Sequence, residues 1–537
     1  MRALNYTLIW LCVLFCAVFP VTAAEGKRPN VVVILVDDMG FSDIGCYGGE
    51  IATPHLDALA KNGVRFSQCY NTGRCSPTRA ALMTGLYPHQ AGMGHLDNKV
   101  VAGHAGFQGK LADTSVTMAQ VLKDAGYFTA MTGKWHLGQQ HGTPPWNSGF
   151  MRSLNLQAGG VYFYNQGGGK GGAKLYLNSA EKEANDPQFG KWYGTDLWTD
   201  YGLKFIDEAK QAQQPFFLYV AHVAPHFPLM APQADIDRYR GKYMVGWDKL
   251  REQRYRRQID MGLVDAAWPL TELADSSSAW NSLSAEDKNR FDHMMAIYAA
   301  AIDVMDRNIG KLVTGLRERG EWENTIILFM SDNGGNAESG PNGKYDGPEK
   351  SGGPNSNIFI GQNWATLNNT PFRKWKHYVH EGGTATPLIA HWPNGIAAAR
   401  QGVFESQPAH VIDIMPTVLA VTGAPYPTQR NGVAVDHFEG VNLLPAMGGE
   451  PLNRPQPIFF NHEDNRAVRE GNWKLVALQG KPWELYDMLK DRTEINNLAA
   501  TNGDVVARLS QAYDAWAVRT RVEIPGLDDN NEKKKKK

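Results

Sequence analysis

The feature that most constrains the fold is a set of short, fully apolar segments separated by helical patterns. Residues 31–36 and 325–330 are continuous apolar runs, a pattern typical of strands that are covered on both faces. Further strand candidates are 128–131, 216–220 and 387–390, and helical patterns are predicted over 54–62, 116–125, 197–209 and 285–319. This alternation predicts βαβ units, and therefore an α/β fold with a large mixed, mostly parallel sheet flanked by helices.

The character of the sequence changes after about residue 445. Short strands are predicted over 457–460, 465–468, 473–477 and 483–486, followed by an amphipathic helix from about 505 to 518. We therefore expect a main α/β domain over residues 25–445 and a smaller C-terminal α+β subdomain of antiparallel strands and a helix over 446–525. Residues 526–537, which end in a lysine run, are expected to form a flexible tail.

The N-terminus has the features of an export signal. Arg2 precedes an apolar stretch, Leu8–Val18, that is too short to span a bilayer, and small residues at 21–24 offer a cleavage site. Residues 1–24 are therefore predicted to be a signal peptide, which places the mature chain in the periplasm or outside the cell. No later stretch predicts a membrane span. The balance of 54 Lys and Arg against 55 Asp and Glu gives a net charge of -1, which indicates no nucleic-acid partner.

Acidic and amide residues follow two of the predicted buried strands. Asp37 and Asp38 come directly after the first strand, and Asp332 and Asn333 follow the strand at 325–330. Open parallel sheets place ligands at the carboxyl ends of their strands, so we expect these side chains to converge. Three carboxylates in one place need a cation among them, and oxygen ligands favour calcium or magnesium over zinc.

A short motif, Cys75-Ser76-Pro77-Thr78-Arg79, predicts the start of a helix. Ser76 is expected to be the N-cap, Pro77 suits the first turn, and Gly85 is a plausible C-terminal stop. The free N–H groups of a helix N-terminus would stabilise an anion there. C-x-P-x-R followed by small residues resembles the signature of the type I sulfatases, which belong to the alkaline phosphatase-like superfamily.

Three further segments match that family in order along the chain. Residues 133–138, G-K-W-H-L-G, resemble the segment from which a lysine and a histidine line the sulfate site, here Lys134 and His136. Residues 224–229, A-P-H-F-P-L, resemble the segment that supplies a second histidine, His226. The stretch from T-P-F-R at 370–373 to E-G-G at 381–383 resembles the one whose lysine, here Lys376, touches sulfate. Residues 246–251, G-W-D-K-L-R, together with the Cys75 segment, look closest to the bacterial arylsulfatases.

The resemblance implies a specific chemistry. In the family, the cysteine of the motif is oxidised to formylglycine by a formylglycine-generating enzyme or a radical sulfatase maturase, and the hydrated aldehyde is the nucleophile. For this chain it implies one Ca²⁺, rather than Mg²⁺, held by Asp37, Asp38, Asp332, Asn333 and the modified Cys75. It also implies catalytic roles for a larger set: Cys75, Arg79, Lys134, His136, His226 and Lys376. His226, with Lys376, would protonate the leaving oxygen, and His136 would remove a proton from the nucleophile.

Several questions stay open from the sequence. The substrate is expected to be an aryl sulfate or a sulfated carbohydrate. A phosphonate or phosphate ester hydrolase of the same superfamily, or an inert secreted protein that binds sulfated glycans, are the alternative functions. Residues 93–98, 159–172 and 336–369, the last with Trp364, are candidate rim segments. Cys46 and Cys69 either form a disulfide or remain unpaired.

Overall fold

The computed structural model describes residues 27–157, 159, 163–164, 174–273, 278–346 and 351–522. The predicted signal peptide, the lysine-rich tail and most of the rim candidate 159–172 lie outside the described residues. Among the helices that are described, none combines the length and the apolar character that crossing a bilayer requires.

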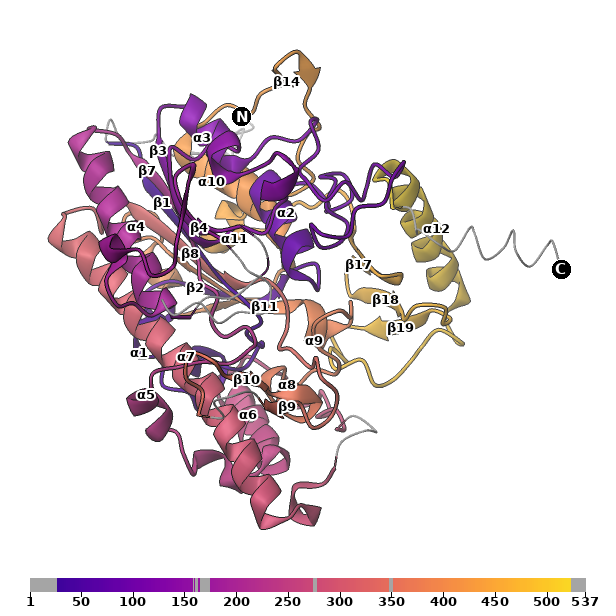
Figure 1. Ribbon diagram of the computed structural model, residues 1–537. Coiled ribbons are helices and arrows are strands. Elements are labelled where there is room, and N and C mark those ends of the chain that lie inside the picture. The colour runs from indigo at the N-terminus through magenta and orange to yellow at the C-terminus, as the bar shows by residue number, and fades with distance from the viewer. Residues whose placement is uncertain are drawn as a thin grey trace, which may run out of the picture.

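A mixed sheet of eleven strands forms the centre of the molecule (Figure 1). Its order is β12-β2-β11-β8-β1-β7-β3-β4-β5-β6, and β13 pairs with β2. The strands are β1 (Asn30–Val36), β2 (Val64–Tyr70), β3 (Phe128–Lys134), β4 (Arg152–Leu156), β5 (Leu175–Leu177), β6 (Ala180–Lys182), β7 (Phe216–Ala221), β8 (Thr325–Ser331), β11 (Ala385–His391), β12 (Phe404–Glu405) and β13 (Ala409–His410). The strands from β8 to β4 are parallel, which confirms the predicted architecture. β11, by contrast, runs antiparallel to both β8 and β2.

Helices cover both faces of this sheet. Along β1, Val32 and Ile34 pack into the core beneath α1, α4 and α7, whereas Val31 and Val33 pack into the core beneath α2, α3 and α10. This alternation explains why the strand is apolar at every position. The helices of these layers are α1 (Pro54–Lys61), α2 (Cys75–Thr84), α3 (Met118–Asp124), α4 (Gly194–Gln211), α7 (Ala285–Glu318) and α10 (Ile414–Thr422).

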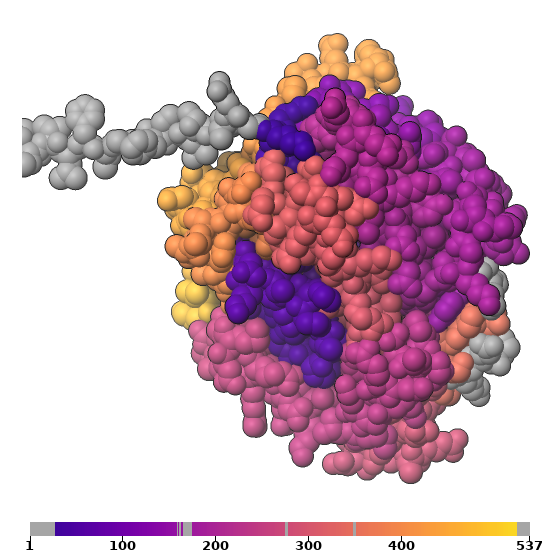
Figure 2. All heavy atoms as spheres, turned by 90° about the vertical axis from the view of Figure 1, so that its left-hand side faces the viewer, coloured from indigo at the N-terminus to yellow at the C-terminus, as the bar shows by residue number. Residues whose placement is uncertain are grey.

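Segments that are distant in the sequence lie side by side on the surface. Leu56 at the start of α1 donates its backbone N–H to Asp306 of α7 at 2.8 Å. In the space-filling view, an indigo N-terminal segment is correspondingly enclosed by pink and salmon segments from the middle of the chain (Figure 2). The smaller elements are α5 (Gln233–Asp237), α6 (Trp247–Asp260), α8 (Gly361–Asn368), α9 (Glu381–Thr384), α11 (Leu444–Gly448) and two hairpins, β9 (Lys344–Asp346) with β10 (Asn357–Phe359) and β14 (Gln429–Arg430) with β15 (Val433–Ala434).

The C-terminal part forms a second sheet. Its four antiparallel strands are β16 (Ile458–His462), β17 (Asn465–Glu470), β18 (Trp473–Ala477) and β19 (Glu484–Asp487), and α12 (Gly503–Arg519) packs beside them (Figure 1). The predicted α+β arrangement is therefore confirmed. Phe459 of β16 stacks on Trp516 of α12 with the ring centroids 5.0 Å apart, so aromatic packing joins the helix to the sheet.

The cysteines resolve one open alternative. Cys46 and Cys69 are both buried and unpaired, so the disulfide does not form in this structure. Cys69 lies in β2, a strand that was not predicted because Arg65 and Gln68 interrupt its apolar pattern.

Candidate active site

Two strand ends bring acidic and amide side chains to one edge of the sheet. β1 and β8 pair in parallel register up to their last residues, so the segments that follow them leave the sheet together. Asn333 donates through Nδ2 to Oδ1 of Asp38 at 2.7 Å, and the backbone N–H of Asp38 lies 3.3 Å from Oδ1 of Asp332. Asp37 and these three residues are at most 1% exposed. Asp38 has a φ of 67°, a conformation that is strained for a residue with a side chain.

Each carboxylate of this group pairs with a basic side chain. The pairs are Lys134 Nζ with Asp37 Oδ2 at 2.5 Å, Lys376 Nζ with Asp38 Oδ1 at 2.6 Å, and Arg79 Nη2 with Asp332 Oδ2 at 2.7 Å. Burial alone would raise the pKa of Asp37 and Asp38. Lys134 and His226 foremost lower the pKa of Asp37, and His226 and Lys376 lower that of Asp38. Burial and then the charge of Asp37 raise the pKa of Asp332 well above its usual range. The buried carboxylates of the site therefore repel one another, in spite of the basic side chains that pair with them.

The same group retains oxygen atoms that lack a hydrogen-bond donor. Asp37 Oδ1 and Asn333 Oδ1 are buried and have no hydrogen-bond partner. A buried polar atom without a partner costs free energy, so this arrangement is suited to a ligand that the protein itself does not supply. Carboxylate and amide oxygens are the donors that a hard divalent cation takes. The residues at the two strand ends therefore form a candidate metal site.

Cys75 begins helix α2 beside this group, although the start of the helix differs from the expectation. The N-cap is Arg74, and Ser76 instead donates through its hydroxyl to the backbone carbonyl of His136 at 2.9 Å. Pro77 remains in the first turn, where no intrahelical N–H is needed. The predicted stop is correct, because Gly85 caps the helix in the left-handed conformation. The Ser76 contact ties the first turn of α2 to the end of β3.

Basic groups surround the Cys75 side chain. Cys75 is 2% exposed, and burial alone would raise the pKa of its thiol. Lys134, His136 and Lys376 outweigh this effect and lower the pKa well below the usual range. His136 Nε2 in turn lies 3.4 Å from Oδ1 of Asp97. The side chain at position 75 therefore lies in a strongly electropositive pocket, as a nucleophile or an anion-binding group requires.

His226 also contacts this group. Its Nε2 lies 3.5 Å from Oδ2 of Asp38, and its Nδ1 lies 2.5 Å from the carbonyl oxygen of Phe227. The Phe227 ring stacks on the imidazole at 4.2 Å, and Phe359 stacks on Phe227 at 4.4 Å. Burial lowers the pKa of His226, against the opposing effect of Asp38. The structure thus brings together the residues for which the sequence predicts a catalytic or metal-binding role.

Sequence reasoning missed several residues of the same region. Asn336 donates through Nδ2 to Oδ2 of Asp38 at 2.7 Å, and Asp97 contacts His136. Both lie inside predicted rim segments, so their general position was predictable but their contacts were not. Arg74, Glu338 and His377 form a connected polar group: Arg74 Nη1 and His377 Nε2 lie 2.9 and 3.1 Å from Oε1 of Glu338.

The prediction that Trp364 lies at the rim of the site is wrong. It is fully buried in α8, where its ring packs edge-on against Trp247 at 5.2 Å and against Tyr243 at 5.7 Å. The segment 336–369 is therefore divided. Its first residues and β10 line the site region, while α8 belongs to the core.

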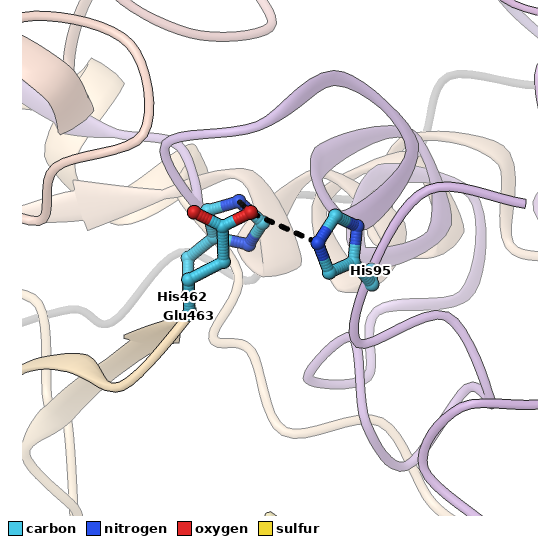
Figure 3. A group of neighbouring side chains, drawn as sticks. All are labelled: His95, His462 and Glu463. Carbon is cyan, nitrogen blue, oxygen red and sulfur yellow. Dashed lines mark hydrogen bonds and ion pairs between the residues drawn. The ribbon is translucent and has the colours of Figure 1, made fainter. Parts of the chain in front are cut away.

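A second group of potential metal ligands lies where a loop after α2 meets the C-terminal sheet. Figure 3 shows His95 facing Glu463, with His462 beside them; ligand atoms of the three lie within 4.8 Å of one another. The backbone N–H of Leu96 donates to Nδ1 of His95 at 2.6 Å, so the proton of a neutral ring is on Nε2, 2.9 Å from Glu463 Oε1. That nitrogen has no free lone pair for a metal. We therefore interpret the contact as a hydrogen bond.

Comparisons with known proteins agree with this geometry. The sequence profile of the sulfatase family matches residues 29–424, and that of the C-terminal region of N-sulphoglucosamine sulphohydrolase matches residues 373–515. An uncharacterized sulfatase of Schizosaccharomyces pombe is 33% identical, over 94% of this chain and 96% of its own. An arylsulfatase of Klebsiella aerogenes is 34% identical, over 75% of this chain and 88% of its own.

A solved structure extends the likeness to three dimensions. The crystal structure of Ps i-CgsB in complex with k-i-k-neocarrahexaose superposes with a TM-score of 0.68 and 25% identity, covering 93% of this chain and 94% of that one. The family profile covers most of the chain, and the full-length relatives exceed the identity at which a shared family is secure. The chain therefore belongs to the sulfatase family and is a sulfuric ester hydrolase that acts on sulfate monoesters.

Proposed function

We propose that the protein hydrolyses aryl sulfates or sulfated carbohydrates through a formylglycine made from Cys75. The observation that carries the proposal is the position of Cys75 at the start of α2, 2% exposed and surrounded by Lys134, His136 and Lys376. Once formed, the hydrated aldehyde would supply a hydroxyl nucleophile at that position. The proposal includes conversion by a formylglycine-generating enzyme or a radical sulfatase maturase during export to the periplasm or the exterior.

We propose that one Ca²⁺ binds at the two strand ends. Asp37, Asp38, Asp332 and Asn333 would hold it together with the modified residue 75. Support comes from the all-oxygen donor set, from the buried oxygens of Asp37 and Asn333 that lack partners, and from the raised pKa of Asp332. A bound cation would supply positive charge to the sulfate oxygens.

The basic residues have distinct proposed roles. Lys134 and Lys376 would neutralise charge on the sulfate oxygens. Each ammonium group lies beside a carboxylate of the metal group, which places it at the proposed sulfate position. Arg79 would position the site, since it bonds Asp332 at 2.7 Å and the carbonyl of Lys134 at 2.9 Å.

The two histidines are proposed to move protons at different atoms. His226, with Lys376, would protonate the leaving oxygen. Burial lowers the pKa of His226. The negative charge of a bound sulfate ester would oppose this effect, so His226 would gain its proton together with the substrate. His136 would accept a proton at residue 75. The charges of the Cys75 thiolate and Asp97 raise the pKa of His136 against burial, and conversion of the cysteine removes the first of these charges.

The domain limits are part of the same proposal. We place the signal peptide at residues 1–24, the catalytic domain at 25–445, the C-terminal subdomain at 446–525 and a tail at 526–537. Support for the boundary near 445 is the change from the large mixed sheet to the separate antiparallel sheet that begins with β16.

Relative turnover of sulfate and phosphorus esters tests the function. Protein from a host with a matching maturase should release sulfate from 4-nitrophenyl sulfate, and a Cys75→Ala variant should not. Higher kcat/KM for phenyl phosphonate or bis-4-nitrophenyl phosphate would instead assign the protein to the phosphonate and phosphate ester hydrolases. A modified protein that turns over none of these esters would be the inert binding protein.

A further inference from the structure

Asp97 is a buried carboxylate to which the proposed mechanism assigns no role. It is 2% exposed, and its Oδ1 lies 3.4 Å from Nε2 of His136, which is itself 5% exposed. Burial alone would raise the pKa of Asp97, but His136 foremost, and then hydrogen bonds from Gln140 and Gly138, lower it. Asp97 is therefore an anion at neutral pH, and its carboxylate can accept a hydrogen bond from the imidazole of His136.

Neighbours from separate parts of the chain fix the orientation of the His136 ring. The backbone of His136 has a φ of 57°, a strained conformation for a residue with a side chain, and its carbonyl accepts a hydrogen bond from the hydroxyl of Ser76 at 2.9 Å. A Cβ atom at Gly159 would lie 2.5 Å from Cε1 and 2.7 Å from Nε2 of the ring. Gly159 therefore packs against one edge of the imidazole, and any larger residue there would displace it.

The two ring nitrogens of His136 have different surroundings. Nε2 faces Asp97, whereas Nδ1 is buried and has no hydrogen-bond partner. The side chain of Cys75 is within hydrogen-bonding reach of the same imidazole. A neutral imidazole carries its proton on one nitrogen and a lone pair on the other. A carboxylate beside Nε2 keeps the proton there, so Nδ1 is the nitrogen that is left to accept a proton.

The loop that carries Asp97 is anchored to the C-terminal sheet. His95 Nε2 lies 2.9 Å from Oε1 of Glu463, the contact seen in Figure 3, and Glu463 directly follows β16. A Cβ atom at Gly109 would lie 2.5 Å from the carbonyl oxygen of Asp97, so Gly109 packs against the backbone of this residue. The position of Asp97 beside His136 thus depends on contacts outside the site.

We propose that Asp97 is a positioning residue, which accepts the Nε2 proton of His136 in a hydrogen bond and so presents the Nδ1 lone pair to residue 75. This inference rests on the sulfatase function proposed above. After sulfate transfer, Nδ1 takes the proton of the remaining hydroxyl at residue 75, the O–H electron pair forms the carbonyl, and sulfate leaves with the electron pair of the broken C–O bond. Asp97 stays ionised and stabilises the imidazolium, as the carboxylate of a catalytic triad does.

Asp97→Asn tests the proposal because it keeps the size of the side chain but removes its charge, and the amide can donate to Nε2 as readily as accept from it. With 4-nitrophenyl sulfate as the substrate, kcat should fall by about 10²–10⁴-fold, the usual contribution of a general base. KM should fall by the same factor, because the sulfated enzyme accumulates when its breakdown slows. Rapid quench should then detect one equivalent of 4-nitrophenol in the first turnover.

A double-mutant cycle with His136→Ala shows whether Asp97 acts through the imidazole. In the His136→Ala background, Asp97→Asn should change kcat by no more than about twofold, because the ring that it positions is absent. Asp292→Asn is the control. Asp292 is 1% exposed and accepts backbone hydrogen bonds from Gly241 and Tyr243 at 3.0 Å, so the variant also neutralises a buried carboxylate. It should leave kcat and KM within about twofold of the wild-type values.

Nitrogen NMR of the full-length protein, labelled at its histidine rings, tests the tautomer without turnover. The His136 signals are those that His136→Ala lacks. At alkaline pH, where the ring is neutral, the wild type should carry a proton on Nε2 and none on Nδ1. Asp97→Asn should shift both signals toward a mixture of the two tautomers, whereas Asp292→Asn should not.

Three results would overturn the positioning role of Asp97. They are a wild-type ring that carries its proton on Nδ1, a rise in KM at unchanged kcat for Asp97→Asn, and an equal loss from Asp97→Asn in the His136→Ala background. The second result would make Asp97 a substrate-binding residue. Wild-type protein with formylglycine that hydrolyses no sulfate ester would reject the proposed function instead, and the NMR spectra would still decide whether Asp97 sets the tautomer of His136.

Discussion

Lys474 Nζ lies 2.8 Å from Oε1 of Glu381 and 2.8 Å from Oε1 of Glu494, and all three side chains are fully buried. Lys474 belongs to β18 of the C-terminal sheet, whereas Glu381 begins α9, five residues after Lys376. Arg492 adds a contact from its Nε to Oε2 of Glu381 at 2.8 Å. An ionic network without solvent access thus joins the C-terminal sheet to the segment that carries a proposed catalytic lysine.

Lys474→Met should strongly destabilise the protein. Removal of the ammonium group leaves Glu381 and Glu494 as buried carboxylates with one cation fewer, a change that typically costs about 3–5 kcal/mol. Urea unfolding of both proteins measures this cost. Lys490→Met is the control, because Lys490 is 81% exposed and lies 3.4 Å from Asp487; it should change the free energy of unfolding by less than about 0.5 kcal/mol. A similar small effect for both variants would show that the network contributes little.

Active protein should contain formylglycine at position 75. Among the three cysteines that the structure describes, Cys46 and Cys69 are buried in the core and lie outside the motif, so their peptides should remain unmodified and serve as internal controls. Mass spectrometry of the tryptic peptides from the native host measures all three. Full activity in a sample with only cysteine at position 75 would contradict the mechanism.

Asp38→Ala should abolish metal binding and turnover together. The substitution removes a carboxylate that also accepts hydrogen bonds from Asn333, Asn336 and Lys376, so the cation site loses both charge and order. Elemental analysis after dialysis should find about one calcium per wild-type chain and much less in the variant. Asp113→Ala, at a carboxylate that is 79% exposed, should retain the metal. Unchanged activity in wild-type protein stripped of metal would rule the cation out.

His226→Ala should slow esters with poor leaving groups far more than esters with good ones. General acid catalysis typically contributes about 10²–10⁴-fold where the departing oxygen needs a proton, and little where it does not. A series of aryl and alkyl sulfates with rising leaving-group pKa measures the slope. A uniform loss across the series would move the acid role to Lys376.

His136→Ala should behave differently across the same series. If His136 takes a proton at residue 75 after sulfate transfer, the variant should release one equivalent of alcohol or phenol and then stall, whatever the leaving group. Rapid-quench measurement of the first turnover detects this burst. Steady turnover without a burst would contradict the role.

Asp306→Asn should change the pH dependence of stability. Burial raises the pKa of Asp306 to about 7, even though it accepts backbone hydrogen bonds from His55 and Leu56. From about pH 4 to 7 the folded state therefore holds a proton that the unfolded state has lost, and stability falls as the pH rises. The variant lacks this loss, so its free energy of unfolding relative to that of the wild type should rise by about 3 kcal/mol between pH 4.5 and 8, as measured by urea unfolding. A constant difference across that range would show that Asp306 has an ordinary pKa.

The sequence predicted the parts of the fold that depend on local pattern. The strands β1 and β8 were recognisable because they are buried on both faces, and the residues after them were recognisable because strand ends in a parallel sheet converge. β2 was not predicted, because Arg65 and Gln68 interrupt its apolar pattern. The direction of β11 could not be predicted either, because the neighbouring strands set it and its own residues do not.

Contacts across long separations could not be predicted in the same way. Ser76 is a residue type that favours the N-cap, but its hydroxyl donates to the backbone carbonyl of His136, 60 residues later in the chain. Trp364 was expected at the rim because it lies in a long connection. Its ring is instead buried and packs against Trp247 and Tyr243. The network of Lys474 and Glu381 likewise depends on two charged residues becoming fully buried, which composition does not reveal.

The network also affects how this enzyme can be recombined with its relatives. The matched C-terminal profile begins at residue 373, before Lys376 and Glu381, and so includes both sides of the ionic contact. A chimera joined at the start of β16 would separate Glu381 from its partners and leave charges buried without compensation. A junction before residue 370 would transfer them together. The C-terminal sheet and the lysine segment would therefore have to be exchanged together, although the sheet itself provides none of the proposed catalytic residues.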